Sequence, residues 1–429
     1  MSRGGWRRRC IYARLSGMRI LLTLALSISL VFAAELPVSA PEQLGFSRER
    51  LQRINTLMRE HVAAGDMAGA SGLVARNGKI VFRENWGEMR ADSIVRMYSM
   101  TKAVTGVAAM ILYEEGKFSL TDPVSKYMPE FSDMRVAHES KDSAGKRIYY
   151  TTPVEHPILV RDLFRHTTGF DYSGPMDETG EIAYKKLDMV GGAPLASFDL
   201  AEAVRRLATA PLHEEPGTSW RYGYSIDILG RLVEVCSGKT LDQFFEERIF
   251  RPLGMKDTAF FLPEEKWSRL ATLYTPKKGG GVERSTSPAQ ERFKKKPALL
   301  LGGAGLVSTM DDYTRFVMML VNEGQLDGVR ILGRKTVELM RADHLGDLNR
   351  GSLTDGYGFG LTFAVNLGPG KSATIGSEGE YYWGGAAGTS FWIDPKEHMI
   401  GVFLVQILPS QGVSARDQFK RMAYQALVD

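Results

Sequence analysis

One stretch governs the interpretation of this sequence: Ser99-Met100-Thr101-Lys102-Ala103-Val104-Thr105-Gly106-Val107-Ala108-Ala109-Met110-Ile111-Leu112. Its apolar character predicts a largely buried helix from Ser99 to Glu115. Positions three apart on a helix share one face, so Lys102 can hydrogen-bond the Ser99 hydroxyl. The helix N-terminus also brings unpaired N–H groups and a positive dipole end close to the serine. The pattern predicts a serine nucleophile with a lysine base; the alternative is a plain N-cap serine with a solvent-facing lysine.

A second Ser-x-x-Lys pattern, Ser143-Ala144-Gly145-Lys146, competes with the first. It lies in a charged, glycine-containing segment that offers no buried site, so we do not expect Ser143 to be reactive. The Gly-x-Ser-x-Gly elbow of α/β-hydrolases is absent from the sequence. The seven histidines show no metal-ligand spacing such as His-x-x-x-His, so no metal site is predicted.

A serine–lysine pair needs a second proton-handling group, and the best candidate lies in the segment Pro216-Gly217-Thr218-Ser219-Trp220-Arg221-Tyr222-Gly223-Tyr224-Ser225-Ile226-Asp227-Ile228-Leu229-Gly230. A tyrosine in a turn ahead of a helix projects into a cleft, where its hydroxyl can transfer protons. Tyr222 and Tyr224 both lie in such a turn. The alternative is an aromatic pair that only packs against the turn.

The chain before the serine and the middle of the chain differ in pattern. Ser47 is the N-cap of a helix predicted to reach about His61. Asn77-Gly78 stands between two apolar runs, which is the strongest short-range signal for a β-hairpin. Residues 119–265 contain helical stretches such as Leu200–Leu207 and Asp227–Cys236. They predict a helical subdomain of roughly 119–265.

The C-terminal part returns to strands, predicted over Tyr357–Leu367, Gly388–Asp394 and Met399–Leu408, with a last amphipathic helix from Ala415 to Leu427. Strands at both ends of the chain that enclose a helical middle predict one antiparallel sheet, built from both termini and flanked by helices. The expected fold class is therefore α/β (α+β), with the helical subdomain inserted.

Composition and charge exclude several classes of protein. Of 429 residues, 44% are hydrophobic and 24% are charged, which excludes a disordered chain, a collagen-like fibre and a multi-span membrane protein. Residues 1–33 hold six of the 54 basic side chains and no acid, which leaves 48 basic against 50 acidic side chains. We expect no nucleic-acid partner. The polar segment from Pro276 to Pro297, with the run Lys294-Lys295-Lys296, is interpreted as a solvated loop.

The N-terminus has the pattern of a secretory signal. Arginines precede the apolar run Ile20–Ala33, which is shorter than a membrane-spanning helix. Residues 1–33 are predicted to be removed on export, so that the mature protein is periplasmic or secreted and not bound to a membrane. An uncleaved anchor is the alternative, and Met18 is a second candidate start. With Cys10 in the leader, the mature chain keeps Cys236 as its one thiol and forms no internal disulfide.

Four separated segments together resemble the serine β-lactamase-like superfamily. They are Ser99-x-x-Lys102, Pro216–Gly230, Gly302-Gly303-Ala304-Gly305-Leu306-Val307-Ser308-Thr309 and Tyr382-Trp383-Gly384-Gly385-Ala386-Ala387-Gly388-Thr389. Arg161–Phe170 also looks like the family's Leu-Leu-x-His-Thr-Ser-Gly segment. The likeness covers residues 41–425 and is greatest to class C β-lactamase-related esterases, the family VIII carboxylesterases. It implies a β-lactamase/transpeptidase-like fold with the active site in a groove between a helical subdomain and an α/β sandwich.

The resemblance implies roles for particular residues. Ser99 matches the nucleophile, Lys102 its general-base partner, and Tyr222 the first residue of the family's Tyr-x-Asn motif. Tyr224 stands in the third place of that motif, where the lactamases carry asparagine, and is expected to contact substrate. His166 and Arg165 are expected to serve the structure.

The second part of the family pattern concerns the oxyanion and the substrate. Trp383-Gly384-Gly385 stands where the lactamases have Lys-Thr-Gly, and the esterases often have Trp-Gly-Gly; all three residues are expected to bind substrate. The N–H groups of Ser99 and Ala386 would form the oxyanion hole. The departures at Tyr224 and Trp383 argue against lactamase activity, although Arg416 on the last helix is a candidate to receive a lactam carboxylate.

The expected reaction is hydrolysis of a small-molecule ester through an acyl-enzyme, with no metal or organic cofactor. A β-lactamase or D-alanyl-D-alanine peptidase on the same scaffold is the first alternative. A module that binds β-lactams or peptidoglycan stems without turnover is the second. Release of an acyl group from Ser99 would separate the enzymes from the binding module.

Overall fold

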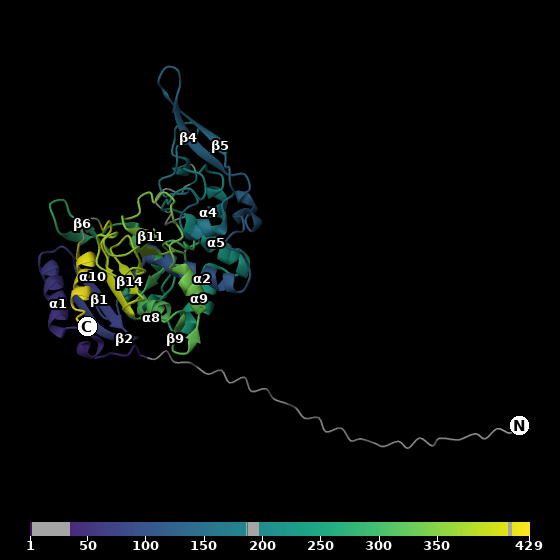
Figure 1. Ribbon diagram of the computed structural model, residues 1–429. Helices are drawn as coiled ribbons and strands as arrows, with labels where there is room; N and C mark the ends of the chain where they lie inside the picture. Colours follow the sequence, from purple (N-terminus) through teal and green to yellow (C-terminus); the bar gives the residue numbers. More distant parts are fainter. Residues whose placement is uncertain (2–34, 186, 188–196, 411–413) are drawn as a thin grey trace. The chain divides into compact units, whose positions relative to one another are not determined.

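A seven-stranded antiparallel sheet built from both ends of the chain lies at the centre of the fold (Figure 1). This confirms the predicted architecture. In spatial order the strands are β11 (Tyr357–Phe359), β12 (Ala364–Asn366), β13 (Tyr381–Gly384), β14 (Ser390–Asp394), β15 (Met399–Val405), β1 (Gly69–Arg76) and β2 (Lys79–Gly87). The C-terminal strand β15 pairs directly with the N-terminal strand β1, from Ala70 opposite Val405 to Arg76 opposite Met399.

The structure, a computed structural model, describes residues 1, 35–185, 187, 197–410 and 414–429. Residues Ala33–Asp429 form one compact unit. Apart from Met1, the predicted signal segment 1–33 lies outside the described residues.

Two turns in the sheet test the sequence analysis. The β1–β2 hairpin turns at Asn77 and Gly78, whose φ angles of 51° and 75° are the positive values that a type I′ turn requires. The prediction of one strand over Tyr357–Leu367 is wrong, because this segment folds back on itself as β11 and β12. Gly360 N–H donates to Phe363 O at 2.7 Å and closes that turn. The continuous run of apolar residues concealed the reversal, since both strands are buried.

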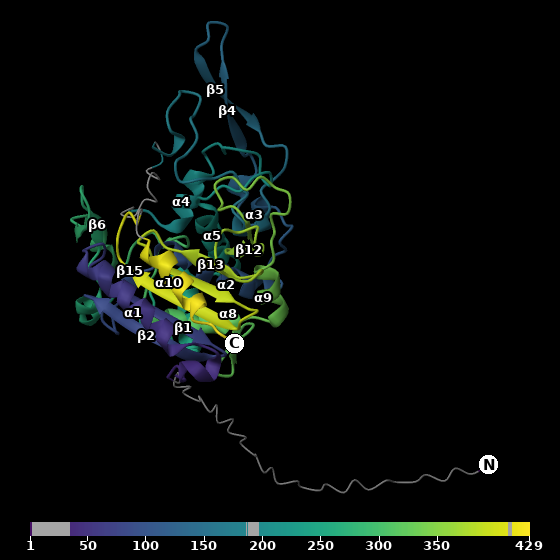
Figure 2. The same cartoon turned by 60° about the vertical axis from the view of Figure 1, so that its left-hand side comes forward.

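Helices cover both faces of the sheet. On one face α1 (Arg48–Ala63) and α10 (Ala415–Gln425) pack side by side, as Figures 1 and 2 both show. On the other face lies α8 (Met310–Val321), which contacts β14 and β15, and the apolar α2 (Thr101–Glu114) belongs to the same hydrophobic core. Ser47 accepts from Arg50 N–H and caps α1, as predicted.

The inserted subdomain lies between α2 and α8. Its helices are α3 (Val160–Phe164), α4 (Leu200–Leu207), α5 (Ser225–Ser237), α6 (Leu241–Phe245), a π-helical turn (Glu246–Phe250) and α7 (Arg251–Leu253). The subdomain is not purely helical, because β4 (Arg135–Lys141) and β5 (Arg147–Pro153) form a long hairpin that projects from it in Figure 1. Ser143 lies in the exposed tip of this hairpin. The strands β4 and β5 were not predicted, because the charged segment between them was interpreted only as a loop.

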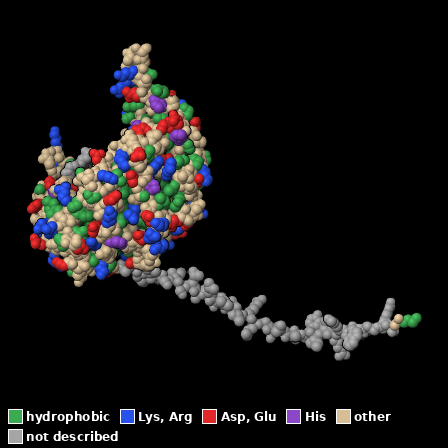
Figure 3. All heavy atoms as spheres, in the orientation of Figure 1, with side chains coloured by type: hydrophobic (Ala, Val, Ile, Leu, Met, Phe, Trp, Pro, Cys, Tyr) green, Lys and Arg blue, Asp and Glu red, His purple; other side chains and the backbone are tan. Residues whose placement is uncertain are grey.

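The segment Pro276–Pro297 is only partly solvated, which corrects the sequence analysis. It contains the strand β7 (Val282–Arg284), paired with β6 (Tyr274–Pro276), and two short 3₁₀ turns, Pro288–Gln290 and Arg292–Lys294. Lys295 and Lys296 are exposed as expected, but Phe293 beside them is buried. Figure 3 shows Lys and Arg side chains interspersed with Asp and Glu over the visible face.

The remaining elements are short. They comprise the strands β3 (Val95–Arg96), β8 (Val307–Ser308), β9 (Gln325–Leu326) and β10 (Val329–Arg330), the helix α9 (Arg334–Met340), and 3₁₀ turns at Pro41–Leu44, Tyr98–Met100, Val124–Lys126, Pro129–Phe131, Ala183–Lys185 and Glu264–Arg269. Among the helices of the described residues, none has the length and apolar character needed to cross a membrane.

Candidate active site

Ser99 lies in the 3₁₀ turn Tyr98–Met100, between β3 and the first residue of α2. The α-helix therefore begins two residues later than predicted, at Thr101, although the three-residue spacing to Lys102 still places both side chains together. Tyr98 has φ of 45°, a conformation that costs a non-glycine residue about 1–3 kcal/mol and is found at functional turns. The turn leaves Ser99 half-buried, with its hydroxyl open to neighbours from the inserted subdomain.

Lys102 is buried, with 1% of its surface exposed, which excludes the alternative of a solvent-facing lysine. Its Nζ donates to Ser99 Oγ at 3.3 Å, to Tyr172 OH at 3.1 Å and to Gly303 O at 2.8 Å. Three oxygen atoms therefore surround Nζ at hydrogen-bond distance. The lysine is thus held in one position against the serine.

Tyr222 supplies the second polar contact to the serine. Its OH donates to Ser99 Oγ at 2.6 Å, and its ring lies under Lys102 Nζ, 4.7 Å from the ring centroid. The structure therefore brings Ser99, Lys102 and Tyr222 into one hydrogen-bonded cluster, as the sequence analysis predicted. Tyr222 lies three residues before α5, and its side chain reaches the turn at the start of α2.

Tyr224 does not lie where a substrate could touch it, which corrects the prediction. It is fully buried, and its ring packs edge-on against Tyr172 and Tyr184 at centroid distances of 4.7 and 5.5 Å. Tyr172 occupies the place beside Lys102 instead. Tyr224 is the N-cap of α5 and has helical backbone angles (φ −70°, ψ −4°), and the bend at Gly223 separates it from Tyr222.

His166 packs behind Tyr222, with 4.9 Å between the ring centroids. Its Nδ1 accepts from Gly223 N–H at 3.4 Å. Burial lowers the pKa of His166 well below its usual value, and the nearby charge of Lys102 acts in the same direction. The imidazole is therefore neutral and serves the structure, as expected; so does Arg165, which donates to Asp162 and Thr167.

Trp383, on β13, forms a wall beside the cluster. Its ring lies 5.4 Å from that of Tyr222, and Nε1 has no acceptor among the described residues. Gly385 follows in a tight turn, where a Cβ would lie 2.4 Å from Met97 O and 2.2 Å from Thr389 Oγ1. Only glycine fits this close approach. It brings the exposed Ala386 next to the segment that carries Ser99.

Arg416 lies on the α10 side of this strand. A Cβ on Gly384 would lie 3.4 Å from Arg416 Nη1, and Arg416 Nε donates to Asp417 at 2.9 Å. The guanidinium is thus already engaged with a carboxylate.

Sequence reasoning missed two residues that support Lys102. Tyr172 accepts from its Nζ, and Asp227 acts through Gly303, whose N–H donates to Asp227 Oδ1 at 2.8 Å while its carbonyl accepts from Lys102. Burial raises the pKa of the Asp227 carboxyl, while the Lys102 charge opposes that shift. Tyr172 is only two residues beyond the Arg161–Phe170 segment, but no local sequence pattern predicts that its hydroxyl contacts Lys102. Only the packing of the subdomain brings it to the lysine.

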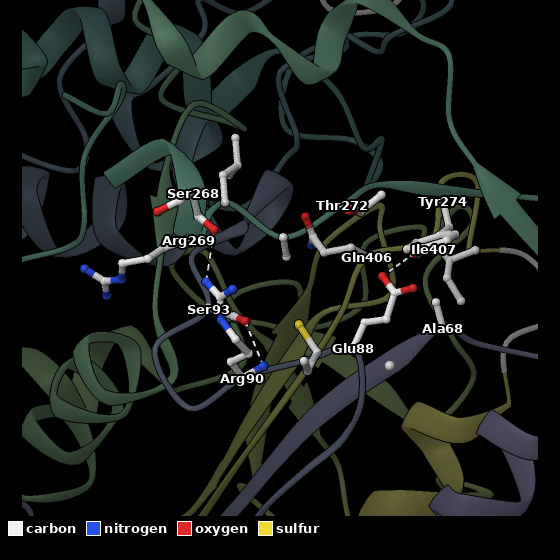
Figure 4. A pocket seen from close by; sticks show the side chains of 14 residues that line it. Ala68, Glu88, Arg90, Ser93, Ser268, Arg269, Thr272, Tyr274, Gln406 and Ile407 are labelled. Carbon is white, nitrogen blue, oxygen red and sulfur yellow. Dashed lines mark hydrogen bonds between the residues drawn. The ribbon is translucent and has the colours of Figure 1, made fainter. Parts of the chain in front are cut away.

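A cavity of about 180 Å³ lies elsewhere, between the start of β1 and the segment Ser268–Tyr274 (Figure 4). Its lining includes none of the cluster residues. Its polar groups are paired: Tyr274 OH donates to Glu88 at 2.5 Å, and Arg90 Nη2 donates to Ser268 O at 3.0 Å. Within the described part of the chain, no group of three His, Cys, Asp or Glu side chains is placed to hold a metal ion.

Comparison with known proteins identifies the family. The family described as Beta-lactamase matches residues 54–425. This chain belongs to the β-lactamase family. Two relatives are Protein Rv1367c of Mycobacterium tuberculosis, 34% identical over 379 residues (83% of this chain, 90% of that protein), and esterase EstB of Burkholderia gladioli, 29% identical over 368 residues (80% and 86%).

The solved structures agree with this β-lactamase-family assignment. EstCE1, described as a hydrolase with promiscuous acyltransferase activity, superposes with a TM-score of 0.74 at 28% identity and covers 88% of this chain and 99% of its own. The predicted β-lactamase/transpeptidase-like fold is confirmed. Membership of the family and its esterase relatives support serine hydrolase activity in general.

Proposed function

We propose that this protein hydrolyses carboxylic esters through an acyl-enzyme on Ser99, with Lys102 and Tyr222 as the proton-transfer groups. One observation carries the proposal: Ser99 Oγ accepts hydrogen bonds from both Tyr222 OH and Lys102 Nζ. A nucleophile in reach of two proton-handling groups, one of them fixed by other partners, is the arrangement that acyl transfer needs.

The reaction proceeds in two steps. The Lys102–Tyr222 pair acts with one proton removed, which leaves a lone pair to take up the serine proton. Ser99 Oγ attacks the ester carbonyl, its proton passes to that lone pair, and the two residues then return a proton to the departing alcohol. Water then attacks the acyl-enzyme, gives up a proton to the same pair, and the carboxylic acid leaves as Ser99 regains its hydrogen. The tetrahedral oxyanion receives hydrogen bonds from the N–H groups of Ser99 and Ala386.

The tryptophan favours esters over β-lactams. A β-lactam carries a carboxylate beside its scissile amide, and a cationic group normally receives such a charge. The indole N–H of Trp383 donates one neutral hydrogen bond and supplies no charge, while its ring gives an apolar wall for a short or medium acyl chain. Arg416, the other candidate for the carboxylate, is engaged with Asp417. The proposed site of action is outside the cytoplasm, on the strength of the leader 1–33.

The test compares p-nitrophenyl esters of graded acyl length with a chromogenic cephalosporin. We expect clear turnover of acetate to hexanoate esters and weak or absent turnover of the cephalosporin. A kcat/KM for the cephalosporin equal to or above that for p-nitrophenyl butyrate would establish the lactamase alternative. Acylation of Ser99 without release would establish the binding module.

A further inference from the structure

Arg292 lies in the segment that the sequence assigns to a solvated loop, yet the segment is fastened to the strand that leads to Ser99. Arg96 of β3 donates from Nη2 to Gln290 O at 2.9 Å. Phe293 is buried between two guanidinium groups, with Arg96 Cζ 5.8 Å and Arg292 Cζ 5.2 Å from its ring centroid. These contacts fix the position of Arg292 relative to β3.

Arg292 is half-buried, and its guanidinium forms no ion pair among the described residues. Its Nε and Nη2 atoms are inaccessible and find no acceptor among the described residues. Two neighbouring cations of the same segment are paired, Lys294 with Glu291 and Lys296 with Asp242, each at 2.6 Å. A buried charge without a partner is costly, so an unpaired guanidinium here needs a reason beyond folding.

The two unpaired atoms belong together. Nε and Nη2 form one edge of the guanidinium, with two parallel N–H bonds that match the two oxygens of a carboxylate. One carboxylate would therefore satisfy both. A single neutral acceptor would leave one N–H unpaired.

Arg292 lies two residues beyond Gln290, whose carbonyl accepts from Arg96 on the strand that leads to Ser99. Burial lowers the pKa of its guanidinium, and the charges of Tyr98 and Asp227 oppose that shift. Tyr98 precedes Ser99 in the chain, and Asp227 holds Gly303, the acceptor of Lys102. Asp227 makes no hydrogen bond to Arg292, and its charge is shared with Lys102.

We propose that Arg292 binds the carboxylate of an anionic ester through its Nε–Nη2 edge, so that the substrates are carboxylate-bearing esters such as monoesters of short dicarboxylic acids. This inference rests on the proposed esterase function. In this proposal Arg292 selects the charged group of the substrate, while Trp383 contacts its apolar part.

The kinetic test uses one neutral and two anionic esters. These are p-nitrophenyl butyrate, mono-p-nitrophenyl glutarate with its carboxylate on the acid side, and 3-butyryloxybenzoate with its carboxylate on the alcohol side. In Arg292→Gln we expect KM for at least one anionic ester to rise about 10- to 100-fold, as for loss of a charge-assisted bidentate contact, with a smaller change for the butyrate. Arg292→Lys keeps the positive charge but cannot form two parallel hydrogen bonds, so its KM for that anionic ester should lie between those of the wild type and Arg292→Gln.

Two control variants separate the local contact from net charge. Lys294→Gln removes the same charge from the same segment and should not alter the preference, and Arg416→Gln tests the other candidate cation. Equal losses on neutral and anionic esters in Arg292→Gln, or loss of the preference in Arg416→Gln instead, would overturn the inference. Thermal unfolding of each variant shows whether it is folded; if Arg292→Gln is not, the comparison rests on Arg292→Lys.

A binding measurement distinguishes failure of this inference from failure of the proposed function. Calorimetry with Ser99→Ala needs no turnover and uses both anionic types, monomethyl glutarate with its carboxylate on the acid side and 3-butyryloxybenzoate with its carboxylate on the alcohol side. Binding that Arg292→Gln weakens at least tenfold supports the anion site even if the wild type hydrolyses no ester. Binding that is absent, or equal with and without Arg292, overturns it even if butyrate is hydrolysed well.

Discussion

At the scale of single residues, the reactivity of Ser99 depends on what its neighbours are already bonded to. Lys102 is held by Gly303 and Tyr172, so its position does not depend on the serine. Tyr222 is held by packing against His166 and Trp383. Ser99 follows the strained Tyr98 in a 3₁₀ turn, and its Oγ accepts from both Lys102 and Tyr222.

Ser99→Ala should reduce ester hydrolysis about 10³-fold or more, because only oxyanion stabilisation and binding remain. A fluorophosphonate probe should label a peptide that contains Ser99. The matched control is Ser143→Ala, which removes the hydroxyl of the second Ser-x-x-Lys pattern at the exposed hairpin tip and should change neither rate nor labelling. Labelling that survives in Ser99→Ala would contradict the assignment.

The three tyrosines should differ in effect. Tyr222→Phe removes the hydroxyl 2.6 Å from Ser99 Oγ and should lower kcat by about 10²–10⁴-fold. Tyr172→Phe removes an acceptor of Lys102 and should cost about tenfold, because burial raises the pKa of Tyr172 well above its usual value and the group only positions the lysine. Tyr224→Phe, in the core, should cost least. Steady-state kinetics on p-nitrophenyl butyrate checks the order; a larger loss in Tyr224→Phe than in Tyr222→Phe would contradict it.

At the scale of elements, the first turn of α8 carries a buried carboxylate, Asp312, that holds the segment Asp257–Thr258 against the helix. Asp312 Oδ2 accepts from Asp257 N–H at 2.6 Å and from Thr258 Oγ1 at 2.9 Å. Burial raises the pKa of Asp312 to about 6 despite these hydrogen bonds. The folded protein therefore keeps a proton on this group at a pH where the unfolded chain has lost it.

This shift predicts a pH dependence of stability. Between about pH 4 and about pH 6 the folded state binds more protons at Asp312 than the unfolded state, so this group's contribution to the free energy of unfolding falls as pH rises, by about 1–3 kcal/mol. In Asp312→Asn the free energy of unfolding should not show this decrease between about pH 4 and about pH 6. Urea denaturation near pH 4 and near pH 7 measures the difference. Asp311→Asn, at an exposed neighbour, is the control; if it removes the pH dependence and Asp312→Asn does not, the cause lies elsewhere.

At the scale of the whole molecule, the two ends of the chain fold together. Phe46 bridges to Leu427, and Arg76 pairs with Asp429 at 2.6 Å. The sheet cannot form before the last strand has been made, because β15 is the partner of β1.

Protein recovered from a secreting bacterial host should begin near Ala34, because the apolar run before it has the length of a signal segment. N-terminal sequencing checks the start, and thiol titration of the unfolded protein should find one cysteine, Cys236. A chain that begins at Met1 or Met18 would support the uncleaved anchor.

The sequence pattern was sufficient to predict those features that depend on residues close together in the chain. The pairing of Ser99 with Lys102 follows from a three-residue spacing, the β1–β2 turn from Asn77-Gly78, and the α1 cap from Ser47. The antiparallel sheet could be predicted because apolar runs at both ends must bury their faces against something. The family resemblance added Tyr222 and the Trp383-Gly384-Gly385 turn, since these lie in separate segments with recognisable motifs.

The remaining features come from contacts between residues far apart in the chain, which no local period encodes. Tyr172 reaches Lys102 across 70 positions, and Asp227 acts on it through a glycine carbonyl. Tyr224 is buried against Tyr172 and Tyr184, and two nitrogens of Arg292 are buried beside Phe293, which packs against Arg96. The sequence by itself determined the chemistry at the centre of the site; the tertiary structure alone decided which side chains surround it, because burial and charge pairing depend on neighbours that only folding brings together.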